Sequence, residues 1–178
     1  MYSDVIMAGF GGQGIMLIGK ILAYTGMKEG RHVVWIPSYG PEMRGGTANC
    51  TVVVSDKPIA SPVIANPDSI VVMNKPSLDK FETWVKEGGT VVINETLIDR
   101  KTKRKDVHAT YLPANKIAME LGTAKAANMV MLGAYVALTK VISKEGAIEG
   151  IKHSMANKEK FIPINLKAFN TGYDLASK

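Results

Sequence analysis

The chain has 178 residues with 46% hydrophobic and 21% charged side chains, proportions that exclude a disordered or fibrous protein. Its length fits one domain over residues 1–178 with a sizeable core. Because the chain has one cysteine, it can form no intrachain disulfide, and it cannot by itself build an iron–sulfur cluster or a multi-cysteine metal site.

The net charge of +6 depends on one short segment, residues 100–105, which holds five Lys and Arg side chains. The segment has no aromatic residue for stacking on bases and is too short to follow a groove, so nucleic acid is not an expected partner. We interpret it first as a solvated turn between two strands, and second as a docking patch for an acidic protein.

The first 40 residues predict a βαβ unit. Residues 5–8 form an apolar run of strand length, residues 15–30 show helical spacing closed by a glycine, and residues 32–36 form a second strand ended by Pro37. Such a unit is Rossmann-like and implies a parallel strand pair with a right-handed crossover.

The turn between the first strand and the helix is rich in glycine. Its sequence, Gly9-Phe-Gly-Gly-Gln-Gly14, satisfies the pattern G-x-G-x-x-G in a strand-turn-helix context. Glycines let the backbone approach a phosphate closely, and the helix start favours an anion. The candidate binding residues here are Gly9, Gly11, Gly12, Gln13 and Gly14. The alternative is a tight turn that needs glycine and binds nothing.

A nicotinamide-dinucleotide site would place Asp or Glu at the end of the second strand, to hold the ribose hydroxyls. This strand ends instead at Ile36, Pro37 and Ser38. The missing carboxylate counts against an independent NAD enzyme.

Residues 37–49 form the second candidate segment. Arg44 is a permanent cation next to flexible glycines, with hydroxyl and amide side chains around it. In a doubly wound sheet this loop would lie beside the glycine turn, at the strand ends where ligands gather. The candidate residues are Ser38, Tyr39, Arg44, Gly45, Gly46, Thr47 and Asn49. The alternative is a rigid surface loop in which Arg44 pairs with Glu42 or with another subunit.

Strands and helices continue to alternate after this segment, and the last third is helical. The alternation predicts an α/β fold with a doubly wound, mostly parallel sheet covered on both faces, and with a helical C-terminal layer. Cys50, on the apolar face of its strand, should be buried. Strands are expected at 50–55, 69–74, 89–94 and 107–112, and helices at 78–86, 125–142, 144–155 and 164–176.

The sequence offers no evident catalytic or metal site. His32, His108 and His153 are scattered, and no carboxylate pair, Ser-His-Asp set or metal-ligand spacing stands out. The longest apolar stretch, residues 129–138, is far shorter than the roughly 20 residues of a membrane-spanning helix. The N-terminus shows no secretion signal, so we expect a cytoplasmic binding component without membrane contact.

The two candidate segments, Gly9 to Gly14 and Ser38-Tyr-Gly-Pro-Glu-Met-Arg-Gly-Gly-Thr-Ala-Asn-Cys50, resemble the gamma subunit of 2-oxoacid:ferredoxin oxidoreductases. Further similarity lies in residues 68–74, 89–94 and 127–134, so the resemblance covers most of the chain. The form Met-Arg-Gly-Gly-Thr-Ala-Asn is most similar to the 2-oxoglutarate-type or branched-chain subgroup.

The resemblance implies an assembly that converts a 2-oxoacid, with 2-oxoglutarate expected, and coenzyme A to acyl-CoA and carbon dioxide, passing electrons to ferredoxin. It implies alpha, beta and ferredoxin-like delta subunits as partners, with thiamine diphosphate and iron–sulfur clusters on those partners. This chain, inactive alone, would help to form the coenzyme A and substrate region. Two alternatives remain open: a free-standing dinucleotide or flavin protein, and a purely structural assembly subunit.

Overall fold

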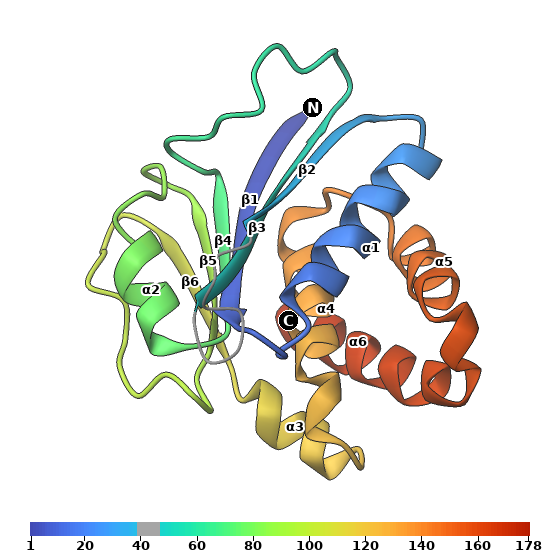
Figure 1. Ribbon diagram of the computed structural model, residues 1–178. Helices are drawn as coiled ribbons and strands as arrows, with labels where there is room; N and C mark the ends of the chain where they lie inside the picture. Colours follow the sequence, from blue (N-terminus) through green and yellow to red (C-terminus); the bar gives the residue numbers. More distant parts are fainter. Residues whose placement is uncertain (39–46) are drawn as a thin grey trace.

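A computed structural model describes residues 1–38 and 47–178 of the chain, which form a mixed sheet between helices (Figure 1). The sheet alternates apolar side chains toward its two faces: Val5 and Met7 of the first strand join one core cluster, and Ile6 and Ala8 join the other. Both faces are therefore buried in the middle of the sheet, as is typical of parallel strands. The strands are β1 (Tyr2–Phe10), β2 (His32–Ser38), β3 (Thr47–Ser55), β4 (Ser69–Val72), β5 (Thr90–Asn94) and β6 (His108–Leu112).

The strand order is β2-β3-β1-β4-β5-β6. Strands β1, β4, β5 and β6 are parallel neighbours, whereas β3 runs antiparallel to both β1 and β2. The expected α/β class with a mostly parallel sheet is thus confirmed. The expected pairing of the first two strands is wrong, because β3 inserts between them and satisfies the backbone hydrogen bonds of both.

Helices cover the two faces unequally (Figure 1). Helix α2 lies on one face, and α1, α4, α5 and α6 form a thick layer on the other, which confirms the predicted helical C-terminal layer. The helices are α1 (Ile15–Lys28), α2 (Lys75–Phe81), α3 (Ala114–Glu120), α4 (Ala127–Thr139), α5 (Lys144–Ser154) and α6 (Ile162–Ala176), with the short 3-10 helices η1 (Ala124–Ala126) and η2 (Ala156–Phe161) leading into α4 and α6.

Helix α4 is the centre of this layer, and it is buried from residue 127 to residue 137. It packs backbone to backbone on α6, because a methyl group at Gly133 would overlap the carbonyl oxygen of Phe169, and one at Gly172 would overlap that of Val130. Small residues at the crossing therefore decide how closely the two helices approach. No described helix is long and apolar enough to cross a membrane.

The helices α2 and α3 differ most from expectation. Helix α2 starts at Lys75 rather than 78 because Asn74 caps it, with Oδ1 accepting a hydrogen bond from the Ser77 N–H at 2.9 Å. It ends at Phe81 rather than 86. Helix α3 was not predicted, since seven residues are too few to show a clear helical period.

The basic segment 100–105 is less solvated than its composition indicates. Arg100 makes ion pairs with Glu82, at 2.8 Å, and with Asp79, while Arg104 donates to the carbonyl oxygens of Glu82 and Val85. The segment does lie between β5 and β6 as expected, but its two arginines hold the end of α2 in place. Lys101, Lys103 and Lys105 are exposed.

Candidate functional site

The glycine turn between β1 and α1 is a compact loop closed by its own glutamine. Oε1 of Gln13 accepts a hydrogen bond from the Phe10 N–H at 2.6 Å, and the Gln13 N–H donates to the Phe10 carbonyl at 3.1 Å. A side chain at Gly9 would come within 2.6 Å of that Oε1 atom. Oε1 of Gln13 therefore shapes the loop, and Gly9 leaves room for it; contact of Gln13 with a ligand stays a prediction.

Gly12 and Gly14 have positive φ angles of 95° and 76°, a region that favours glycine. They differ in their surroundings: a methyl group at Gly12 would meet nothing within 4 Å, whereas one at Gly14 would overlap Nδ2 of Asn128. The Asn128 amide donates to the Gly14 carbonyl at 3.1 Å, across 114 positions of the chain. The turn therefore has room for a ligand at Gly12, whereas at Gly14 it is hydrogen-bonded to α4.

Three of the residues predicted in the second segment lie at the same edge of the sheet as the glycine turn. In the strand register Thr47 faces Phe10, and Asn49 faces both Ala8 and Ser38. The described residues Ser38, Thr47 and Asn49 of the second segment therefore lie near the glycine turn, as the sequence predicted. Tyr39, Arg44, Gly45 and Gly46 lie outside the described residues.

Two asparagines lie at this edge: Asn94 is the last residue of β5, and Asn74 comes just after its parallel neighbour β4. Nδ2 of Asn94 donates to Oδ1 of Asn115 at 2.7 Å, while Oδ1 of Asn94 and Nδ2 of Asn74 are buried and have no partner among the described residues. Buried polar atoms are nearly always hydrogen-bonded, so these two atoms mark positions for water or a ligand group.

A cavity of about 520 Å³ opens on the other side of the glycine turn, toward the helical layer, and we call it the interhelical cavity. Its volume is within the range of small-molecule sites. None of Ser38, Thr47 and Asn49 is among its described lining residues, which are Gly12, Gly14, Leu17, Thr123, Lys125, Ala126, Asn128, Met155, Lys158, Phe161 and Asn165.

Sequence reasoning missed the residues of this cavity beyond the glycine turn. Apart from Leu17 of α1, they come from the regions around the start of α4 and between α5 and α6, more than 100 positions away from the turn, and no local motif joins them. One signal was present: Asn128 is a polar residue on an otherwise apolar helix and is only 3% exposed. A second cavity, of about 160 Å³, touches the turn at Gly12 and Gln13 and reaches Met73 and Asn115.

Cys50 is fully buried, as predicted. Burial raises the pKa of its thiol to about 12, which keeps it protonated and unreactive at neutral pH. Its sulfur lies close to Gly19 of α1, where a methyl group would come within 2.5 Å of Sγ. Cys50 is thus a packing residue between β3 and α1.

Comparison with known proteins identifies the family. Residues 4–175 match the protein family described as "pyruvate ferredoxin/flavodoxin oxidoreductase". The ketoisovalerate oxidoreductase subunit VorA of Methanothermobacter marburgensis is 43% identical over 98% of this chain and 36% of its own, so the chain spans about a third of that relative.

Two solved structures share the fold. The gamma subunit of a keto/oxoacid ferredoxin oxidoreductase from Geobacter sulfurreducens superposes with a TM-score of 0.86 at 32% identity, over 98% of both chains. A 2-oxoglutarate:ferredoxin oxidoreductase from Magnetococcus marinus, with 2-oxoglutarate, coenzyme A and succinyl-CoA bound, gives a TM-score of 0.89 at 26% identity, over 98% of this chain and 31% of that one. The chain belongs to the pyruvate ferredoxin/flavodoxin oxidoreductase family.

Proposed function

We propose that this chain is the gamma component of a multisubunit 2-oxoacid:ferredoxin oxidoreductase. The observation that carries the proposal is the end-to-end match to a gamma subunit, which covers 98% of each chain. The partial coverage of the VorA and Magnetococcus marinus chains, 36% and 31%, indicates that the same unit also occurs joined to further domains. As partners of this unit we propose the alpha, beta and delta subunits of such an enzyme.

A single cysteine cannot supply the four thiolates of an iron–sulfur cluster, which agrees with clusters that reside on partner subunits. From the family resemblance we also assign thiamine diphosphate to the partners and ferredoxin to the role of electron acceptor of the complex. The isolated chain would be inactive. We further propose a cytoplasmic location for the assembly.

Within the assembly, the glycine turn and residues 38–49 would help to form the coenzyme A region. The turn presents open backbone at Gly12, and Thr47 and Asn49 lie at the same sheet edge. Backbone N–H groups and the start of α1 favour phosphate groups, and Arg44 would add a permanent cation from the same segment. A structural neighbour that binds coenzyme A supports this choice of ligand.

The strand order also weakens the alternative of a free-standing dinucleotide protein. In a dinucleotide site the second strand lies next to the first and carries the ribose-binding acid. Here β3 separates β1 from β2, so the end of β2 is one strand farther from the glycine turn.

Two substrates are candidates. 2-Oxoglutarate is our first choice, supported by the Magnetococcus marinus neighbour, while the motif in residues 43–49 fits the 2-oxoglutarate-type and branched-chain subgroups alike. 2-Ketoisovalerate is the second, because the more similar relative carries that name.

Purification of the complex from its source, followed by assays with pyruvate, 2-oxoglutarate and 2-ketoisovalerate, tests the proposal. We expect the chain to copurify with thiamine- and cluster-containing subunits and the complex to reduce ferredoxin only with coenzyme A present. A chain that elutes alone, without 2-oxoacid oxidation in its fractions, would refute it.

Calorimetric titration of the complex tests the role of the candidate loop. Arg44→Ala should weaken coenzyme A binding about tenfold or more, the loss of one charge-assisted contact. Arg31→Ala is the control, because Arg31 pairs with Asp56 and not with the glycine turn. An unchanged affinity with weakened assembly would instead assign Arg44 to subunit docking.

A further inference from the structure

Three helices start at the interhelical cavity. The N-cap residues of α1, α4 and α6 are Gly14, Ala126 and Phe161, and all three line it. None of these caps has a side-chain hydrogen bond to its helix, and the first turns of the three helices contain no acidic residue. This differs from α5, which begins with a Ser143 cap and has Glu145 in its first turn.

The helix starts give the cavity a positive potential. Helices α1, α4 and α6 have 14, 13 and 15 residues, and each places the positive end of its dipole at the cavity wall. The 3-10 turns before α4 and α6 satisfy some of the first N–H groups, since the Ile162 N–H bonds to the Glu159 carbonyl. Helix α1 has no such lead-in turn, so its first N–H groups are the ones available to an anion.

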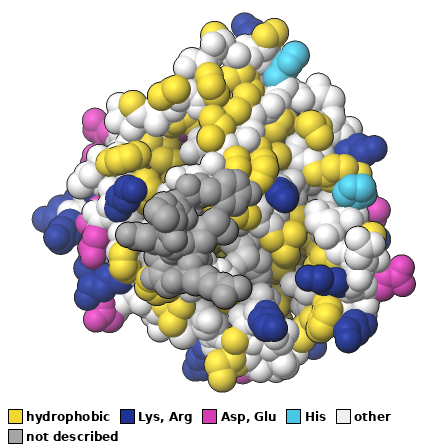
Figure 2. Space-filling model, viewed as in Figure 1, with side chains coloured by type: hydrophobic (Ala, Val, Ile, Leu, Met, Phe, Trp, Pro, Cys, Tyr) yellow, Lys and Arg dark blue, Asp and Glu magenta, His cyan; other side chains and the backbone are white. Residues whose placement is uncertain are grey.

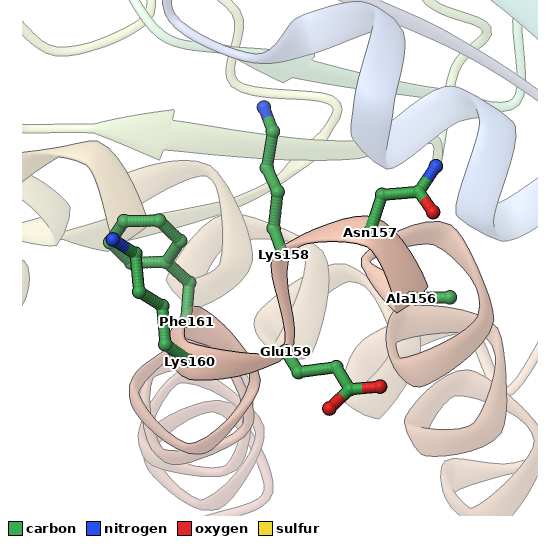
Figure 3. A pocket seen from close by; sticks show the side chains of 6 residues that line it. All are labelled: Ala156, Asn157, Lys158, Glu159, Lys160 and Phe161. Carbon is green, nitrogen blue, oxygen red and sulfur yellow. The ribbon is translucent and has the colours of Figure 1, made fainter.

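Two lysines add full charges. Lys125 and Lys158 line the cavity, and its described lining residues include no Asp or Glu. Figure 3 shows the neighbouring pocket formed by residues 156–161, in which Lys158 and Glu159 point in opposite directions from the η2 backbone. Figure 2, which has the same viewpoint as Figure 1, shows Lys and Arg side chains at its lower right, where Figure 1 places the helical layer.

Asn128 provides an independent indication of a ligand. Its side chain lines the cavity and is 3% exposed, and its Nδ2 is held by the Gly14 carbonyl. Its Oδ1 is buried without a partner among the described residues. Leaving such an atom unsatisfied is costly, so a hydroxyl or N–H donor from a bound molecule would stabilise it.

We propose that the interhelical cavity binds a phosphate or diphosphate group of a ligand that also carries a hydrogen-bond donor. Lys125 and Lys158 balance its charge, the start of α1 donates backbone N–H groups, and Asn128 accepts a hydrogen bond from the donor. The proposal rests on the proposed function only in assuming a phosphorylated ligand at the glycine turn. It gives the C-terminal helical layer a part in binding the phosphorylated ligand, beyond the part proposed above for residues 38–49.

Titration of the full chain with inorganic diphosphate at low salt, followed by calorimetry and by NMR shifts of the α1 N–H groups, tests this inference. We expect saturable binding that weakens about tenfold or more in the double variant Lys125→Gln, Lys158→Gln, since each lysine makes a charge-assisted contact. The matched control is Lys116→Gln, Lys167→Gln, which removes the same charge from exposed positions outside the cavity lining. Circular dichroism checks that all variants are folded.

Absence of saturable diphosphate binding by the native chain would overturn the inference, and so would equal weakening in both double variants. Either result would leave the proposed function standing if the chain still copurifies with the catalytic subunits. Diphosphate binding by a chain that forms no such complex would support the cavity and refute the proposed function.

Discussion

Replacing Gly14 by alanine tests how the glycine turn is joined to the helical layer. Alanine at φ 76° costs about 1–2 kcal/mol in backbone energy alone. The added methyl group also displaces the Asn128 amide, which breaks its hydrogen bond to the Gly14 carbonyl and costs about 1 kcal/mol more. We expect Gly14→Ala to lower the free energy of unfolding by about 2–3 kcal/mol.

Urea unfolding followed by circular dichroism measures this loss, and Gly12→Ala is the matched control. Gly12 also has a positive φ but has no neighbour within 4 Å of an added methyl group, so only the backbone cost of about 1–2 kcal/mol applies. In an Asn128→Ala background, Gly14→Ala should cost no more than Gly12→Ala does. Equal losses for Gly12→Ala and Gly14→Ala in the native background would contradict the reasoning.

Three further results are expected. Gly172→Ala should destabilise the chain by about 3 kcal/mol or more in urea unfolding, because its methyl group would overlap the Val130 carbonyl and force α4 and α6 apart; a loss below 1 kcal/mol would show that the helices separate easily. Burial disfavours the charged form of Glu82, but hydrogen bonds led by that from Arg100 outweigh burial and hold the pKa of Glu82 below its usual value. The stability contributed by Glu82 is therefore present above about pH 4.3 and is lost as the pH falls through the lowered pKa, and Glu82→Gln should remove this part of the acid dependence; an unaltered pH profile of unfolding would argue against it. Cys50, whose pKa burial raises to about 12, should resist a thiol reagent at pH 8 in the folded chain and react at once in urea; rapid labelling of the folded chain would show that β3 and α1 open readily.

Local patterns were sufficient for most of the elements. The strands expected at 69–74 and 89–94 and the helix expected at 125–142 correspond to β4, β5 and α4, because each side-chain period reports one kind of secondary structure. The glycine spacing located the turn between β1 and α1 for the same reason. The sequence pattern did not predict helix α3, because its seven residues span only about two helical turns.

Strand order was beyond such patterns. The pattern of residues 47–55 predicts a strand, but it is the same at the edge of the sheet and between β1 and β2. The side-chain period of a strand does not indicate which strands it pairs with. The insertion of β3 therefore appears only in the tertiary structure, and it changes what the end of β2 can contact.

The sequence by itself determined the fold class, the glycine turn and the family resemblance, because all three depend on residues close together in the chain. Only the tertiary structure decided which groups meet at the turn. Asn128, Lys125 and Lys158 reach it across more than 100 residues, and their meeting depends on how α4 and α5 pack on α1 and α6 packs on α4. Packing of distant helices is set by the shapes of their surfaces, which no local spacing of residue types records.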